Sequence, residues 1–299
     1  MIDEKLYSLI KVYECGSFSE AARRLTLTQP AVSHHIKLLE EELNVRIFER
    51  VSGRISLTKE GETVIRYAKK MLGLYSNMKR DIEDSKSRID HIIVGVTHTA
   101  ESNPIAEALA KYGAENEDIA IKIVTDKINN LYNMLKTYEI DLAVTEGRVS
   151  DPSIHYMLLD TDYLVLAVSP NHPFAMRGMV NINEIRREKL ILRLPGSNTR
   201  NLLDAYIESN RLSIQDFNVV LEVDNVATIK DLIRRDFGIS ILPRSSCLDE
   251  VKKKKIVIVP VENLSIVRET NIAYLNEFER PDILNEIIRY YHEILRSYT

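Results

Sequence analysis

The sequence predicts an α/β multidomain protein with an N-terminal winged helix-turn-helix, a long linker helix and a C-terminal domain of two α/β lobes. Three observations support this prediction. Residues 1–58 combine short segments of helical periodicity with a strand-turn-strand pattern. Residues 59–89 carry a helical heptad repeat without proline, and residues 90–299 alternate between strand and helix signals. A chain of 299 residues is also too long for one compact core.

The composition is typical of a globular protein and argues against several classes, because 44% of the residues are hydrophobic and 28% are charged. The N-terminus lacks the apolar run of a secretory signal, and no stretch approaches the roughly 20 apolar residues of a spanning helix. We therefore expect a cytoplasmic protein without a membrane partner. Cys15 and Cys247 are too few for a disulfide framework, and the histidines lack metal-ligand spacing, so we expect no metal and no cofactor.

Two short helices are expected at the N-terminus. Four apolar residues recur at the spacing of one helical face: Leu6, Leu9, Ile10 and Tyr13. Gly16 should end this helix. Ser17 and Glu20 have the spacing of a capping box, so a second helix should run to about Leu25.

A third helix should run from its N-cap at Thr28 to about Leu43. Its buried stripe is expected to consist of Val32, Ile36, Leu39 and Leu43. Its exposed polar face is expected to consist of Pro30, Ser33, His34 and Lys37. Two helices joined by a three-residue turn, the second with an exposed polar face, describe a helix-turn-helix. A plain three-helix bundle whose polar face meets water has the same periodicity.

A basic hairpin is expected next. Residues 45–50 and 55–58 alternate like short strands around Ser52 and Gly53, and Arg50 and Arg54 flank that turn. A basic hairpin beside a helix-turn-helix is a winged arrangement, in which the helix reads the major groove and the wing holds phosphate or enters the minor groove. Charge alone does not decide this, because the net charge is −4 and the local basic excess is modest.

Motifs across these residues closely resemble the DNA-binding domain of LysR-type transcriptional regulators. The segments are FSEAARRL (18–25), TQPAVS (28–33), IKLLEEEL (36–43), IFER (47–50) and LTKEG (57–61). The resemblance implies a transcriptional regulator that binds double-stranded promoter DNA, with RNA polymerase as a further candidate partner. It implies that the DNA-facing residues are Gln29, Pro30, Ser33, His34 and Lys37, with Arg50 and Arg54 on the wing.

One long helix is expected from Thr58 to about Arg88. Apolar residues spaced by four and three form a heptad seam: Val64, Ala68, Met71, Tyr75, Met78 and Ile82. The seam could instead pack on its own domain, but the flanking residues are so polar that the helix looks exposed elsewhere. The resemblance implies that the chain pairs through this helix and forms a homo-oligomer, commonly a homotetramer assembled as a dimer of dimers.

Beyond His91, alternating signals favour a largely parallel sheet in two lobes, one of residues about 90–161 and 266–299, the other of residues about 162–265. Strands are expected at 91–97, 119–124, 141–144, 163–168, 190–194, 219–223, 238–243 and 270–275. Helices are expected from Asn103-Pro104 and at 129–138, 199–210, 226–237 and 281–297. Segments 141–147, 195–200 and 237–243 resemble the LysR effector-binding domain, which implies a two-lobed sensor resembling periplasmic binding proteins.

Three polar segments are candidates for an effector site between the lobes, since ligands gather beyond the carboxyl ends of strands and at helix N-termini. Their residues are Thr97, His98, Thr99, Thr145, Ser197, Asn198 and Thr199. Hydroxyls and amides with little positive charge suit a small carboxylate or oxyanion, although each hydroxyl taken alone could serve as a cap. Arg200 could be a nearby cation or could be salt-bridged on its helix, so it is left outside the site.

The sequence argues against two other functional classes. A transport-type binding protein should carry an export signal, and an enzyme should show convergent acid, base or nucleophile residues. Neither feature is visible, and no phosphate-binding glycine loop or nucleophile elbow occurs. We therefore expect no catalytic residues, and we expect a ligand in the two-lobed domain to bias the affinity or geometry of the protein on DNA.

Overall fold

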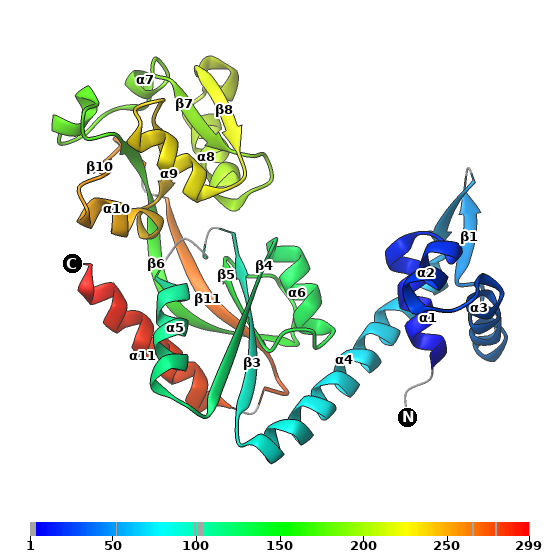
Figure 1. Ribbon diagram of the computed structural model, residues 1–299. Helices are drawn as coiled ribbons and strands as arrows, with labels where there is room; N and C mark the ends of the chain where they lie inside the picture. Colours follow the sequence, from blue (N-terminus) through cyan, green and yellow to red (C-terminus); the bar gives the residue numbers. More distant parts are fainter. Residues whose placement is uncertain are drawn as a thin grey trace. The chain divides into compact units, whose positions relative to one another are not determined.

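A computed structural model describes residues 4–51, 53–98, 100, 104–264, 266–278 and 280–298. The chain divides into two compact units (Figure 1). Met1–Asp90 and Asn133–Glu139 form the first unit, and His91–Tyr132 and Ile140–Thr299 form the second. Within the described residues, no helix combines the length and apolar character needed to cross a membrane.

The first unit begins with three helices and a hairpin, as predicted. These are α1 (Glu4–Cys15), α2 (Phe18–Leu25), α3 (Gln29–Leu43), β1 (Phe48–Val51) and β2 (Arg54–Leu57). Gly16 ends α1 with a φ of 60°, a backbone conformation that glycine adopts without steric cost. The side chains of Ser17 and Thr28 cap α2 and α3 by accepting hydrogen bonds from the amides of Glu20 and Ala31.

Two details of this domain differ from the prediction. The Glu20 carboxylate does not complete the capping box, because it accepts hydrogen bonds from Arg23 and Arg24 at 2.7–2.9 Å. The hydrogen bonds from these two arginines lower the pKa of Glu20 to about 2. Leu43, predicted to be buried, is 47% exposed because it is the last residue of α3 and lies in a surface groove with Met71 rather than in the core.

The linker helix α4 spans Lys59–Ser87, as predicted. The Thr58 hydroxyl caps it by accepting a hydrogen bond from the amide of Gly61 at 2.9 Å. Gly61 packs directly against the hairpin, since a Cβ atom at this position would lie 2.1 Å from the carbonyl oxygen of Ile47. The close contact explains why the LTKEG motif ends in glycine.

The heptad seam of α4 is only partly as predicted. Ala68 is buried and Val64 packs against the core of the N-terminal domain, so the first turns of the seam belong to their own domain. Further along, the large apolar residues that are about half exposed are Tyr67, Met71, Leu74, Met78 and Ile82. We call these five residues the α4 apolar row. It shares three residues with the predicted seam and is spaced by four, three, four and four.

The second unit and α6 contain the two lobes. The first lobe contains β3 (Asp90–Thr97), α5 (Ile105–Glu115), β4 (Ile119–Asp126), α6 (Ile128–Lys136), β5 (Leu142–Glu146) and α11 (Pro281–Ser297). The second lobe contains α7 (Ile182–Ile185), β7 (Leu190–Arg193), α8 (Asn198–Ser209), β8 (Val219–Val223), α9 (Val226–Arg234), β9 (Ser240–Pro243), α10 (Leu248–Lys252), β10 (Val257–Val259) and the 3₁₀ turns η2 (Pro173–Met176), η3 (Ile214–Asp216) and η4 (Arg244–Cys247). Two long strands, β6 (Ile154–Val168) and β11 (Val267–Leu275), cross from lobe to lobe (Figure 1).

The prediction of a largely parallel sheet is wrong. The seven-stranded sheet has the order β10-β6-β11-β5-β3-β4, with β9 also paired to β6. β3 pairs with β5 in parallel, but β11 is antiparallel to both β5 and β6, and β6 is antiparallel to β9 and β10. The crossing strands impose this mixture, because each runs through both lobes and β11 returns to the first.

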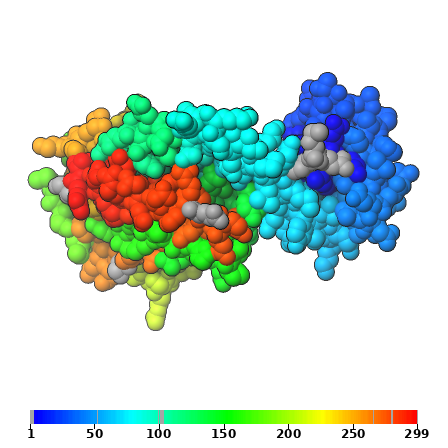
Figure 2. Space-filling model, turned by 90° about the horizontal axis from the view of Figure 1, so that it is seen from below, coloured from blue at the N-terminus to red at the C-terminus, as the bar shows by residue number. Residues whose placement is uncertain are grey.

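Each lobe has its own apolar core. In the first lobe, α5 and α11 lie side by side on the sheet and bury Leu109, Ile287 and Tyr291 (Figure 2). Pro104 occupies the N-cap of α5 rather than its first turn, and Asn103 lies outside the described residues. In the second lobe, Leu166 of β6, Leu192 of β7 and Leu203 of α8 belong to one buried cluster.

Candidate functional site

The polar face of α3 lies at the surface of the first unit. Gln29, Pro30, His34 and Lys37 are exposed, and Ser33 is half-buried. The Gln29 amide donates a hydrogen bond to the Ser33 hydroxyl at 2.7 Å, and the Lys37 ammonium lies 3.4 Å from Glu41. His35 points inward, with its Nδ1 at 2.7 Å from the Ser8 hydroxyl of α1. Short donors and a cation thus line one side of the helix.

The hairpin places its two arginines beside that face. Arg50 and Arg54 are exposed on adjacent strands, in the ladder pairs Arg50–Ile55 and Val51–Arg54. The Glu40 carboxylate of α3 holds the hairpin by accepting hydrogen bonds from the amides of Ile47 and Phe48 at 2.7 and 3.4 Å. The wing is therefore fixed relative to the helix by a side chain of the helix itself.

A groove of about 420 Å³ runs between α3 and the hairpin. Its walls bring together Ser33 and Lys37 of the helix with Arg50 of the wing. They also include Arg46, which the sequence analysis counted among the basic residues but did not place in the site. The groove also contains the carboxylates of Glu40 and Glu49, and Arg46 lies 3.6 Å from Glu40. Its hydroxyl and its cations suit a phosphate backbone, because both kinds of group bind phosphate oxygens.

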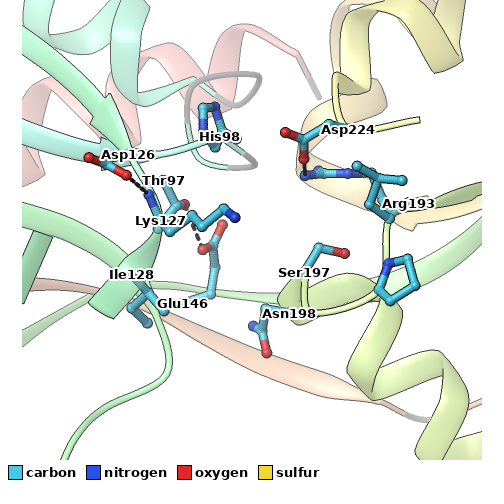
Figure 3. A pocket seen from close by; sticks show the side chains of 13 residues that line it. Thr97, His98, Asp126, Lys127, Ile128, Glu146, Arg193, Ser197, Asn198 and Asp224 are labelled. Carbon is cyan, nitrogen blue, oxygen red and sulfur yellow. Dashed lines mark hydrogen bonds and ion pairs between the residues drawn. The ribbon is translucent and has the colours of Figure 1, made fainter. Parts of the chain in front are cut away.

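A pocket of about 160 Å³ lies in the second unit, where five strands end (Figure 3). Thr97 ends β3, Asp126 ends β4, Glu146 ends β5, Arg193 ends β7, and Asp224 follows β8. Both lobes line the pocket, as the rule for carboxyl ends of strands predicts. The other lining residues are His98, Lys127, Ile128, Leu194, Pro195, Gly196, Ser197 and Asn198.

Four of the seven predicted effector residues line this pocket: Thr97, His98, Ser197 and Asn198. Thr145 does not, because its side chain is fully buried and its hydroxyl lies 2.9 Å from the hydroxyl of Tyr132. Thr199 is also buried and is not among the lining residues. Thr99 lies outside the described residues.

The hydroxyl groups of Thr97 and Ser197 differ in whether their proton is free to donate a hydrogen bond to a ligand. The Thr97 hydroxyl donates to Glu146 Oε2 at 2.7 Å and accepts from the amide of Ala100 at 3.1 Å, so its proton is already used. Ser197 accepts from the amide of Arg200 as the N-cap of α8, which leaves its hydroxyl proton for another acceptor. Because Ser197 is the cap, the next two amides of α8 have no partner within the helix.

Charged residues in the pocket are the main feature that the sequence analysis missed. Arg193 is 4% exposed, and its Nη2 lies 3.4 Å from Asp224. Burial lowers the pKa of Arg193 from its ordinary value. Asp126 accepts from the amide of Lys127 and from the Asn130 side chain at the start of α6. A charged residue at the end of an otherwise apolar strand, as in Leu-Ile-Leu-Arg at 190–193, is the signal that could have revealed Arg193.

Arg200 is salt-bridged, which was one of the two roles that the sequence allowed for it. Its Nε donates to Asp204 at 2.8 Å and its Nη1 donates to Glu222 at 2.6 Å. The guanidinium is buried rather than on the helix surface, and it also donates to the carbonyl of Arg193. Arg200 therefore braces the strand end that carries Arg193.

A buried ion cluster lies behind Glu146. Arg268 of β11 lies between two carboxylates, with Nη2 at 3.0 Å from Asp162 Oδ2 and Nη1 at 3.5 Å from Glu146 Oε1. Asp162, on β6, also accepts from the amide and the hydroxyl of Ser245 in the second lobe, at 3.2 and 2.7 Å. The cluster thus joins the pocket, both crossing strands and the second lobe through the contacts of four side chains.

Two family descriptions match the chain. Residues 4–62 match the bacterial regulatory helix-turn-helix protein of the lysR family, and residues 86–296 match the LysR substrate binding domain. The two matches correspond to the parts that carry the groove and the pocket. They also confirm the predicted combination of a helix-turn-helix with a C-terminal α/β domain.

The chain is similar to known regulators and to solved structures over nearly its whole length. An uncharacterised HTH-type transcriptional regulator of Methanocaldococcus jannaschii is 29% identical over 268 residues, 89% of this chain and 88% of that protein. The regulator CysL of Bacillus subtilis is 25% identical over 281 residues, 92% of this chain and 91% of that protein. CbnR in complex with its target DNA has a TM-score of 0.68 at 17% identity, and covers 98% of this chain and 100% of that one. A cysteine variant of full-length OxyR from Pseudomonas aeruginosa has a TM-score of 0.67 at 21% identity, and covers 98% of this chain and 95% of that one.

Proposed function

The chain belongs to the LysR family of bacterial DNA-binding transcriptional regulators, and from this premise we propose that it recognises promoter DNA through the α3 face and the hairpin and responds to a small ligand in the pocket at the strand ends. The single observation that carries the proposal is the groove in which Ser33, Lys37 and Arg50 converge. Because it acts on promoter DNA, we place the protein in the cytoplasm. It acts by binding rather than by catalysis.

The DNA contacts divide by chemistry. Gln29, Ser33 and His34 carry hydrogen-bonding groups that suit base edges, whereas Lys37, Arg50 and Arg54 suit phosphates or the minor groove. Pro30 lies in the first turn of α3, where a missing amide proton costs no intrahelical hydrogen bond. The Gln29–Ser33 hydrogen bond orders two of these side chains before DNA arrives.

The test is a gel-shift titration of the full chain on its own promoter at two salt concentrations. Ser33→Ala combined with Lys37→Ala should weaken binding and flatten the salt dependence, because a lost phosphate contact releases fewer counterions. Lys254→Ala, which removes an equal charge from an exposed loop of the second unit, is the matched control. Unchanged affinity in the double variant would exclude this face of α3 from the interface.

We further propose that the ligand is a small anion, a carboxylate first and an inorganic oxyanion second. Support comes from the free amides that open α8, the Ser197 hydroxyl and the nearby Lys127 and Arg193. A thermal-shift screen of carboxylates and oxyanions tests this. Ser197→Ala should reduce the shift, whereas Ser213→Ala, at the N-cap of η3 and outside the pocket, should not.

We also propose that copies of the chain associate through the α4 apolar row and assemble as a dimer of dimers. Five half-exposed apolar side chains on an otherwise polar helix support this proposal, since their burial requires a partner surface. A paired protein would present two α3 helices to two half-sites of one promoter. RNA polymerase remains the proposed downstream partner.

A further inference from the structure

The pocket holds a buried carboxylate as well as its cationic groups. Glu146 is 3% exposed and its side chain points into the pocket (Figure 3). Its Oε2 accepts the hydrogen bond from Thr97. Its Oε1 has no hydrogen-bond partner among the described residues, and Nη1 of Arg268 at 3.5 Å is too distant to donate one. A carboxylate in this state favours a further donor.

The other two acidic residues of the pocket are already engaged. Asp126 accepts two hydrogen bonds at the start of α6, and Asp224 lies 3.4 Å from Arg193. Asp224 is also exposed, so water screens its charge. Glu146 is therefore the acidic lining residue whose charge is both buried and incompletely hydrogen-bonded.

Two buried arginines lie near Glu146, but neither donates to its Oε1. Glu146 and Asp162 share the guanidinium of Arg268, and all three side chains are at most 5% exposed. The buried Arg193 adds a second positive charge that interacts with Glu146. Within the described residues Oε1 still accepts no hydrogen bond, and a buried carboxylate oxygen without a donor is costly. The pocket is the side of Glu146 from which such a donor can come.

The opposite side of the pocket is suited to an anion. The amides of Asn198 and Thr199 open α8, and the Ser197 hydroxyl can donate. Lys127 lines the pocket on the side of Glu146 (Figure 3), is exposed, and its ammonium has no ion pair within the part of the chain that the structure describes. At about 160 Å³, the pocket is below the size of sites for drug-sized ligands.

We propose that the ligand of this pocket is a small amino carboxylate, whose protonated amine lies against Glu146 and whose carboxylate binds Ser197 and the amides that open α8. The inference rests on the proposed function, because it takes this pocket as the effector site. It adds that a carboxylate alone is not sufficient. The amine supplies the donor that Glu146 Oε1 lacks, and the two ends of the ligand contact different lobes.

The experiment compares pairs of compounds that differ only in the amine, with the full chain in a thermal-shift assay followed by calorimetric titration. The pairs are L-alanine and propionate, L-serine and 3-hydroxypropionate, L-aspartate and succinate, L-glutamate and glutarate, and γ-aminobutyrate and butyrate. At least one amine-bearing member should raise the unfolding temperature and bind about tenfold or more tightly than its counterpart.

Two matched variants locate the amine. Glu146→Gln keeps the volume and removes the charge, so it should weaken binding of the amine-bearing compound about 10- to 100-fold. Asp224→Asn removes the same charge from the pocket but from a residue already paired with Arg193, and it should change binding less than threefold. If Glu146→Gln does not fold, the paired compounds on the unaltered chain still decide the question.

Three results would overturn the inference. Equal binding by both members of each pair, no binding by any amine-bearing compound, or equal losses in the two variants would each exclude an amine at Glu146. If amine-free carboxylates bind and Ser197→Ala weakens them, the anion site stands and only the amine is wrong. The gel shift with the Ser33 and Lys37 variant does not depend on any of these outcomes.

Discussion

Replacing Asp162 by asparagine should destabilise the second unit strongly. Oδ1 of Asp162 accepts from the amides of Tyr163 and Ser245, and Oδ2 accepts from the Ser245 hydroxyl and from Arg268. Every contact is made by a donor, so an asparagine amide would oppose donors in either orientation. Arg268 would also keep only Glu146, at 3.5 Å, as its counter-charge.

The magnitude follows from burial. Asp162 and Arg268 are 4% and 5% exposed, so water cannot replace the lost partner. Breaking one side of a buried ion pair costs about 3–5 kcal/mol. Arg268→Met should cost a similar amount, because it leaves two buried carboxylates without their cation. The double variant removes the charges of Asp162 and Arg268 together and leaves only Glu146 without this cation, so its loss should fall short of the sum by about 1–3 kcal/mol.

The assay is urea unfolding of the full chain followed by far-ultraviolet circular dichroism, because the chain contains no tryptophan. Glu286→Gln serves as the control, since it breaks an ion pair with Arg289 that is at the surface of α11. A midpoint shift for Asp162→Asn no larger than that of this control would show that the buried ion pair does not stabilise the second unit. Complete additivity of the losses of the two single variants would show that Asp162 and Arg268 do not interact.

Three further predictions concern other parts of the chain. Met71→Glu with Met78→Glu should lower the sedimentation coefficient to that of a monomer, because like charges would meet across the α4 apolar row; an unchanged assembly would show that copies pair elsewhere. Gly61→Ala should destabilise the first unit by about 1–3 kcal/mol through the contact with Ile47, whereas Gly113→Ala, whose Cβ would find its nearest neighbours at 3.8 Å, should be neutral or stabilising in thermal unfolding. Cys247 should react with a thiol reagent only after unfolding, because complete burial raises its pKa to about 12; prompt reaction of both cysteines in the native protein would contradict this.

Local structure in the first unit was predictable because its signals are short-range. The hydroxyls of Thr28 and Thr58 cap their helices by accepting a hydrogen bond from the amide three residues later in the chain. Gly16 ends α1 because glycine adopts a positive φ without steric cost. The exceptions required tertiary information. The Glu20 carboxylate could accept a hydrogen bond either from the N-cap amide or from the side chains of Arg23 and Arg24. The arginines provide the stronger, charge-assisted hydrogen bonds. Spacing along the chain cannot rank those alternatives.

The sequence predicted the position of the pocket but not the charged residues that line it. The topological rule for strand ends located Thr97 and the start of α8 correctly. It could not indicate that Thr145, one residue before Glu146, turns away from the pocket to Tyr132. Adjacent residues of a strand face opposite sides of a sheet, so a one-residue difference decides which of the two lines the cavity. The sequence analysis selected the hydroxyl of Thr145, whereas the carboxylate of Glu146 lines the pocket.

Crossing strands between the lobes were expected, but their length was underestimated because their interiors carry charged residues. Periodicity predicted a strand at 163–168, but β6 extends from Ile154 to Val168 and carries Asp162 in its interior. A charged residue inside a strand reads as a break unless its partner is known, and Arg268 lies 106 residues away. Glu146 and Ser245 extend this pair into the two lobes. A ligand cation at Glu146 would compete with Arg268 for one carboxylate, and any shift of Arg268 would change its hydrogen bond to the Asp162 that also holds Ser245. Because these groups are buried, water cannot take over a lost contact, so the contacts of Arg268 link the charge at Glu146 to the hydrogen bonds between Asp162 and Ser245 of the second lobe.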